Sequence, residues 1–240
     1  MHGQDRDTHP GRDDRRPGVG RRVPHAVSGV GYAPVGEVAE PRRVRELLRA
    51  AGLCSNARLV PPPADAGGRP QPDRTGWRVL GDTTEVALLV AAAKAGVDLS
   101  DEEAAAHRVA EYPFDSDRKL MSTVHKTSDG YRAYVKGAPQ ELLARCTAID
   151  WRGERQPLTD ELRAAVTAAS DQLASQGLRV LAAASRPLDD SRPARHEVER
   201  ELTLLGLVGM LDPPRPEVSD AVDACRRAGI RIVRSPETIR

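Results

Sequence analysis

The sequence predicts an α+β fold, in which antiparallel strands are flanked by helices. Residues 119–126 alternate well enough for a strand, residues 128–130 have turn chemistry, and residues 131–135 are rich in aromatic and β-branched side chains, which together predict a β-hairpin. Residues 83–94 and 159–176 are rich in helix-forming side chains and follow good capping residues. Two further apolar runs, 178–184 and 202–211, have the length of buried strands.

Composition excludes several functional classes. The 240 residues suffice for one domain, or for one domain and part of another. A formal net charge of +1 provides no basic field, so nucleic acid is not the expected partner. Cys54, Cys146 and Cys225 form no CxxC pair, and the six histidines show no HxxxH or HExxH spacing. We therefore expect reduced thiols, without a disulfide framework or a zinc site.

No segment of the sequence is typical of a membrane protein. The longest uninterrupted apolar run is Val86–Ala93, far shorter than the roughly 20 residues that a membrane helix needs. The first residues do not show the charged and then apolar pattern of a signal peptide. We therefore expect a cytoplasmic polypeptide with no membrane span.

The N-terminal third begins with a polar segment. Residues 1–27 mix Arg, Asp, Gly and Pro with few apolar side chains, which predicts a disordered tail. Residues 28–38 are then expected to form a short strand and turn, and 43–56 a helix with one apolar face. The Pro- and Gly-rich residues 61–74 predict a loop, and 77–80 a strand.

The next helix has a clear start signal. Asp82 is a good N-cap, and Glu85 follows three residues later, so a capping box explains Glu85 by structure alone. In that interpretation its carboxylate reaches back to the amide of Asp82. Residues 101–108 predict a further short, solvated helix with an acidic first turn.

The hairpin carries groups suited to a nucleotide. Phe114, the only Phe in the chain, lies in a charged segment that we interpret as a loop, and Lys119 follows it. Lys136 closes the second strand beside Gly137, and Pro139 then suits the first turn of a helix. An aromatic ring can stack on a base while ammonium groups meet its edge and the phosphates. Alternatively, the ring fills a core and the lysines are solvated strand ends.

The C-terminal third predicts a helix, two strands and the start of a βαβ unit. Thr159 caps helix 159–176, and Gly177 ends it. Arg179 is unusual at the start of an apolar strand; it either extends to water or binds phosphate. The βαβ start comprises strand 202–211, helix 218–227 and strand 230–233.

Four segments in this order resemble the nucleotide-binding domain of P-type cation-transporting ATPases. They read FDSDRKLMS from residue 114, KGAPQELLARCT from 136, GLRVLA from 177 and GLVGMLDPPRPEVSDAVDACRRAGIRIV from 206. The resemblance implies a twisted antiparallel sheet flanked by helical hairpins, with a truncated βα tail. It divides the chain into a nucleotide-binding domain at 28–205 and part of a HAD-like phosphorylation domain at 206–240, which includes Asp212, Pro213 and Pro214.

The resemblance also implies roles for the individual residues in ATP binding. Phe114 would stack on the base, and Glu85, with Thr84 alongside, would accept a hydrogen bond from the adenine amino group. Guanine presents a carbonyl at that position, so such an acceptor would favour adenine. The remaining implied contacts are Lys136 and Gly137 at the pocket floor, and Lys119 and Arg179 at the phosphates.

Catalytic parts of that family are missing from the sequence. It contains no DKTGT motif, the nearest string being His125-Lys126-Thr127, and no TGD motif follows residue 233. We therefore expect ATP binding without catalysis, with Mg²⁺ required only when a phosphorylation domain is present. The remaining parts of a membrane transporter would be the partner. Two alternatives are a free-standing regulatory module that binds nucleotide and a non-functional relict of a transporter gene.

Overall fold

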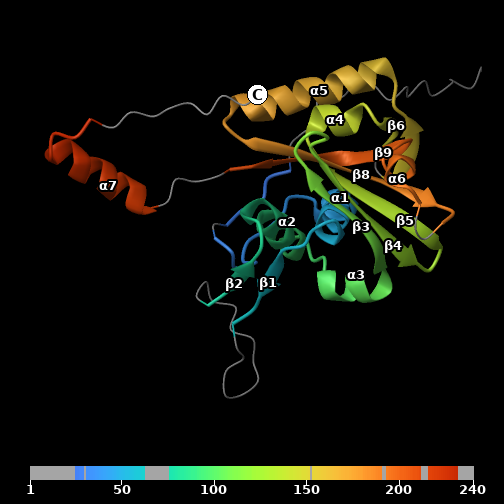
Figure 1. Ribbon diagram of the computed structural model, residues 1–240, viewed down its shortest axis with the longest axis horizontal. Helices are drawn as coiled ribbons and strands as arrows, with labels where there is room; N and C mark the ends of the chain where they lie inside the picture. The colour runs from blue at the N-terminus through green and yellow to red at the C-terminus, as the bar shows by residue number, and fades with distance from the viewer. Residues whose placement is uncertain are drawn as a thin grey trace, which may run out of the picture.

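A seven-stranded sheet forms the centre of the protein in the computed structural model (Figure 1). In spatial order its strands are β3 (His107–Asp115), β4 (Leu120–Thr127), β5 (Gly130–Gly137), β8 (Arg179–Leu188), β9 (Leu202–Met210), β6 (Cys146–Trp151) and β7 (Glu154–Pro157). Neighbouring strands are antiparallel except β6 and β9, which are parallel. The predicted α+β class and mostly antiparallel sheet are confirmed.

The structure describes residues 25–29, 31–62, 76–151, 153–190, 193–211 and 216–231. Most of the predicted tail at 1–27 and of the loop at 61–74 lies outside these ranges, as do Asp212, Pro213 and Pro214 and all but the start of the strand predicted at 230–233. None of the helices in the described ranges has the length and apolar character that a membrane crossing requires.

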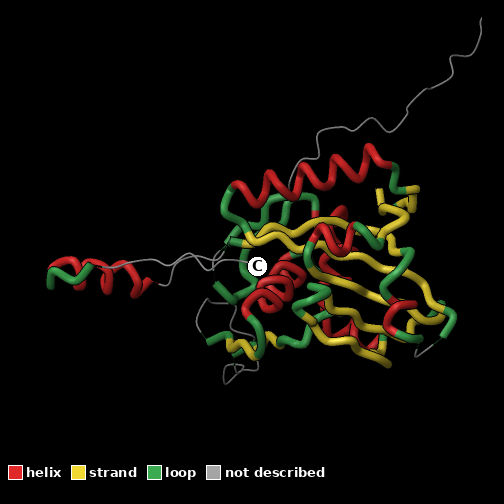
Figure 2. The backbone as a smooth tube through the Cα atoms, turned by 45° about the horizontal axis from the view of Figure 1, so that its top comes forward, coloured by secondary structure: helices red, strands yellow, loops and turns green. Residues whose placement is uncertain are grey.

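Helices cover both faces of the sheet (Figures 1 and 2). One face packs against α1 (Pro41–Leu53) and α2 (Thr83–Lys94), which bury Leu53 and Leu88 against strand residues such as Met121 and Ala183. The opposite face packs against α4 (Pro139–Leu143), α5 (Asp160–Ser175) and α6 (Arg195–Val198). We call these the α1/α2 face and the α4/α5 face.

Three smaller elements complete the described chain. Helix α3 (Leu99–Ala105) packs against α1, and strands β1 (Arg58–Val60) and β2 (Arg78–Leu80) pair with each other beside α2. Helix α7 (Pro216–Arg227) stands apart from the sheet in Figure 1.

The predicted hairpin is confirmed in detail. β4 and β5 pair from Thr127↔Gly130 to Leu120↔Gly137, and Ser128 and Asp129 form the turn between them. Gly130 has a φ of +114°, a conformation that a side chain would disfavour. Thr159 and Gly177 begin and end α5 as predicted.

Several predicted elements need correction. The helix expected at 101–108 ends at Ala105, and Arg108 lies in β3, where it donates to the carbonyls of Leu53 and Ser55. Strands β1, β3, β6 and β7 were not predicted, and the described part of 28–38 forms no strand but only a bridge from Val38 to Val27. Residues 206–210 belong to β9 and pair with β8, while the domain boundary proposed at 205/206 stays a prediction.

Candidate functional site

Lys136 and Glu85 form a buried ion pair on the α1/α2 face. The Lys136 Nζ lies 2.7 Å from Glu85 Oε1, and their side chains are only 8% and 15% exposed. Nζ also donates to Ser55 Oγ at 2.7 Å. An ammonium group has three donors; among the described residues two of them have partners, which leaves the third for a further partner.

Glu85 has a different structural role from the predicted capping box. Asp82 is the N-cap, as expected, and accepts from the amides of Thr84 and Glu85. However, Glu85 Oε2 accepts from the amides of Asn56 and Ala57 at 2.8 and 2.9 Å, so its carboxylate fixes the loop after α1. With Lys136 on Oε1, about one of its four acceptor positions remains open.

Thr84 and Arg179 meet beside this pair. Arg179, at the start of β8, donates from NH1 to Thr84 Oγ1 at 2.9 Å, and the rest of its guanidinium is exposed. Partial burial acts to raise the pKa of Asp82, but hydrogen bonds from Thr84 and Glu85 and the charge of Arg179 lower it overall. The start of α2 therefore places the capping carboxylate of Asp82 and the Thr84 hydroxyl beside the Arg179 guanidinium.

Phe114 lies in strand β3 and not in a loop, which corrects the prediction. The ring is 62% exposed, unusual for a large apolar side chain in a sheet. Pro113 precedes it and has no N–H for a ladder bond, which an edge strand such as β3 tolerates. The ring is available as a stacking surface.

Lys119 lies in the turn that joins β3 to β4. The turn is closed by Asp115, whose Oδ1 accepts from the backbone amides of Asp117 and Arg118. The hydrogen bonds from Arg118 and Asp117 lower the pKa of Asp115. The Lys119 side chain is 50% exposed and lies 3.9 Å from Glu141, a weak surface pair.

Gly137 is required by the path of the neighbouring strand. A Cβ atom at this position would lie 2.1 Å from the carbonyl oxygen of Lys119 and 2.9 Å from the Cα of Leu120. Glycine therefore lets the end of β5 and the start of β4 approach closely, which fixes the backbones of Lys136 and Lys119 relative to each other.

The predicted residues thus gather at one end of the sheet. Lys136 is paired in register with Met121, Gly137 with Leu120 and Ala182, and Arg179 lies just beyond on β8. Sequence reasoning missed Ser55 and the amides of Asn56 and Ala57, because their partners are 28 to 81 residues away. No three His, Cys, Asp or Glu side chains gather as a metal site in the described ranges.

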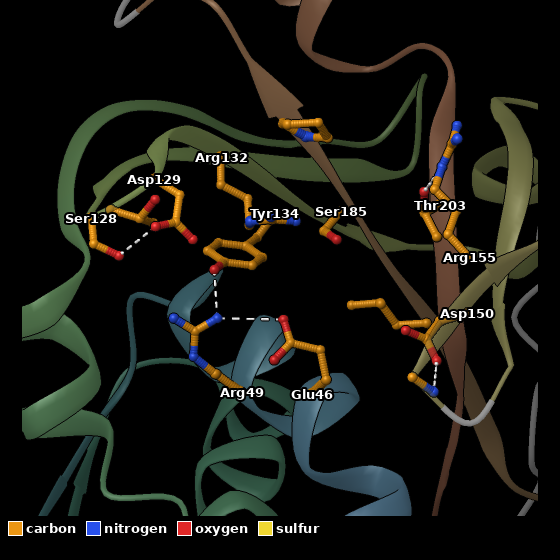
Figure 3. Close-up of a pocket in the computed structure, with 14 residues that line it drawn as sticks. Glu46, Arg49, Ser128, Asp129, Arg132, Tyr134, Asp150, Arg155, Ser185 and Thr203 are labelled. Carbon is orange, nitrogen blue, oxygen red and sulfur yellow. Dashed lines mark hydrogen bonds and ion pairs between the residues drawn. The ribbon is translucent and has the colours of Figure 1, made fainter.

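A separate hollow of about 500 Å³ lies on the α1/α2 face near the opposite end of β5 (Figure 3). Its charged lining residues balance, with three carboxylates and three guanidinium groups: Glu46, Asp129, Asp150, Arg49, Arg132 and Arg155. Arg49 donates to the Tyr134 hydroxyl at 2.6 Å and pairs with Glu102, while Arg155 donates to Thr203 at 3.1 Å. This hollow contains none of the predicted site residues.

Comparisons with known proteins identify the same kind of domain. A family model described as P-type ATPase, cytoplasmic domain N, matches residues 43–217. A calcium-transporting ATPase of Bacillus subtilis is 37% identical over 219 residues, covering 86% of this chain and 23% of the relative. The cation-transporting ATPase pma1 of Synechocystis is 35% identical over 224 residues, covering 87% and 23%.

A third relative agrees with these two. The calcium-transporting ATPase 1 of Bacillus cereus is 42% identical over 153 residues, which is 64% of this chain and 17% of that protein. The chain therefore spans about a quarter or less of the length of these relatives. Because the family model matches well over half of the chain, the chain belongs to the family of the P-type ATPase cytoplasmic N-domain.

Proposed function

We propose that this chain binds ATP at the end of the sheet where Phe114, Lys136 and Arg179 meet the start of α2. The observation that carries the proposal is the combination of an exposed aromatic ring with cationic groups whose donors are not fully used. A ring and several donors suit a base joined to a polyphosphate.

Each group has a distinct role in this proposal. Phe114 stacks on the adenine ring, while Lys136 and Gly137 line the pocket floor. The open acceptor position on Glu85 receives the adenine amino group, with Thr84 alongside. Lys119 and Arg179 bind the phosphates, because both project exposed cationic groups with weak or neutral partners.

We propose further that the chain acts as the nucleotide-binding part of a cation-transporting ATPase on the cytoplasmic side of a membrane. The relatives' names supply this assignment. Residues 206–240, with Asp212, Pro213 and Pro214, would lead into the phosphorylation domain. Transfer of the phosphoryl group and its Mg²⁺ requirement would belong to that domain, because positioning and charge neutralisation provide most of the catalysis.

Calorimetric titration of the chain with ATP and with GTP, with and without Mg²⁺, tests the proposal. We expect saturable binding that favours ATP and changes little with Mg²⁺. A folded chain that binds neither nucleotide would refute the proposed function.

A further inference from the structure

The strand that carries Phe114 contains a β-bulge. Tyr112 is paired with Ser122 and Asp115 with Leu120, so β3 has two residues between these pairs where β4 has one. Without the extra residue, Phe114 itself would lie opposite Leu120. The bulge therefore decides the side of the sheet on which the Phe114 ring lies.

The side of the sheet on which the Phe114 ring lies decides whether the ring faces the proposed site. Leu120 is fully buried on the α4/α5 face, whereas Met121 and its partner Lys136 lie on the α1/α2 face. Residues directly opposite one another share a face and successive residues alternate, so Asp115 shares the face of Leu120 and Phe114 shares that of Lys136. A regular strand would direct the ring away from Lys136.

Arg118 holds this bulge from within the following turn. Its NH2 group donates to the carbonyl of Tyr112 at 3.2 Å and also to the carbonyl of Pro113. These are the carbonyls at the point where the ladder becomes irregular. The guanidinium side chain is only 10% exposed, so its contacts are enclosed by protein.

Glu199 fixes the position of Arg118. NH1 of Arg118 donates to Glu199 Oε1, and Ser122 Oγ donates to the same oxygen at 2.7 Å. The Glu199 side chain is 5% exposed and follows α6, 81 residues from Arg118. Ser122 is the residue paired with Tyr112, so the carboxylate connects both strands at the last regular pair before the bulge.

We infer that Arg118 and Glu199 are positioning residues, which hold the bulge that turns Phe114 toward the proposed nucleotide site. The inference rests on the proposed function, because the orientation of the ring affects ATP binding only if the ring stacks on the base. The contacting groups are buried around the α4/α5 side of the strands, so neither residue needs to touch the nucleotide. A fixed ring loses less conformational entropy on binding, which raises affinity.

The single Phe of the chain allows a direct test. Incorporation of 4-fluorophenylalanine into the full chain gives one ¹⁹F resonance, which reports on Phe114 alone. The principal variant is Arg118→Gln/Glu199→Gln, since it leaves no unpaired buried charge. Arg118→Lys is the conservative variant. Arg163→Gln is the matched control, because Arg163 also donates to two carbonyls, those of Leu143 and Cys146, away from the bulge.

We expect the ¹⁹F resonance of the double variant to move or broaden in the absence of ligand. ATP affinity should fall by about tenfold, because part of the free energy of base stacking is lost. Affinity for tripolyphosphate, which has no base, should not change. In a Phe114→Ala background the double variant should cause no further loss. Arg118→Lys should restore part of the affinity, and Arg163→Gln should behave as wild type.

An unchanged resonance and unchanged ATP affinity in the folded double variant would overturn the inference. An equal loss for ATP and tripolyphosphate would also overturn it, because a general distortion would then explain the result. If ATP does not bind the wild-type chain, while the double variant still changes the Phe114 resonance without ligand, the proposed function fails and the positioning of the ring by Arg118 and Glu199 is supported.

Discussion

The two ends of strand β5 provide similar charged side chains but use them differently. At one end, among the described residues, Lys136 uses two of its three donors, Arg179 donates only to a hydroxyl, and Phe114 is exposed. At the other end, the hollow in Figure 3 has a volume of about 500 Å³, yet its carboxylates and guanidinium groups balance. The proposed site is thus distinguished by an exposed aromatic ring beside cationic groups and not by the volume of a cavity.

This difference has a physical basis in the cost of binding. In the balanced hollow, Arg49 already has the partners Tyr134 and Glu102, with which a ligand would compete. A nucleotide at the Phe114 end instead meets a ring face and the donors of Lys119 and Arg179, which are exposed to water. Groups that need no rearrangement on binding contribute more of their interaction to affinity. The predictions below test whether the two ends differ in this way.

The largest effect should come from Lys136→Met. It leaves the Glu85 carboxylate buried without its cation, so we expect the free energy of unfolding to fall by about 3–5 kcal/mol. ATP affinity should fall by roughly 100-fold. Urea unfolding and calorimetric titration measure the two quantities.

Arg132→Gln is the matched control for Lys136→Met. Arg132 lies four residues earlier on the same face of β5 and lines the hollow. We expect stability within about 0.5 kcal/mol of wild type and unchanged ATP affinity. Lys136→Met/Glu85→Gln should recover stability but not ATP binding. Equal losses in Lys136→Met and Arg132→Gln would remove the distinction between the two ends.

A pH dependence of stability should arise at His125, near the hollow. Nδ1 contacts the Ala106 carbonyl, which can only accept, so Nδ1 carries the proton and Nε2 accepts from Thr123. Burial, together with the charges of Arg108 and Arg49, lowers the pKa of His125 to about 4. The unfolded state binds the proton more readily, so stability is present above pH 6.5 and falls by about 1.4 kcal/mol per pH unit between 6.5 and 4.

Urea unfolding between pH 7.5 and 4.5 checks this dependence. His125→Gln should flatten the curve, and His107→Gln, at an exposed histidine on the neighbouring strand, should leave it unchanged. If the stability of His125→Gln depends on pH with the same slope as that of the wild type, other groups cause the acid sensitivity.

Phe114→Ala should weaken ATP binding with little effect on stability. Base stacking on an aromatic ring is worth about 1–3 kcal/mol, which corresponds to roughly 10- to 100-fold in affinity. The ring is 62% exposed, so its removal should change the free energy of unfolding by less than about 0.5 kcal/mol. Tyr32→Ala, at an aromatic side chain that is 43% exposed, is the control. Unchanged ATP affinity in Phe114→Ala would refute the stacking role.

The smallest effect should come from Arg179→Gln. Its guanidinium is exposed to water, so we expect ATP affinity to fall by only about fivefold, near 1 kcal/mol. Adenosine, which has no phosphate, should bind with unchanged affinity. An equal loss for adenosine would show that Arg179 acts through Thr84 and the base, and not through the phosphates.

Local patterns predicted most of the elements that position the site. The turn at 128–130 and the caps Asp82 and Thr159 depend on neighbouring residues, and the structure confirms them. The placement of Phe114 in a loop was wrong, because a charged segment with a proline hides an edge strand with a bulge. Glu85 was also misassigned structurally, since its partners Asn56 and Lys136 are far away in the sequence.

The contacts that complete the site could not be predicted from sequence in the same way. Arg118 and Glu199 are 81 residues apart, as are Ser55 and Lys136. No periodicity or spacing relates such pairs, because the sheet order β3-β4-β5-β8-β9-β6-β7 brings them together.

The most direct test of the account is an NMR titration of the full chain with ATP, followed through backbone amide resonances. We predict saturable shifts at Phe114, Lys136, Gly137 and Arg179, with weaker effects from GTP. Arg132, Ser185 and Thr203 around the hollow should remain unchanged. Shifts confined to the hollow, or no shifts at either end of β5, would contradict the central claim.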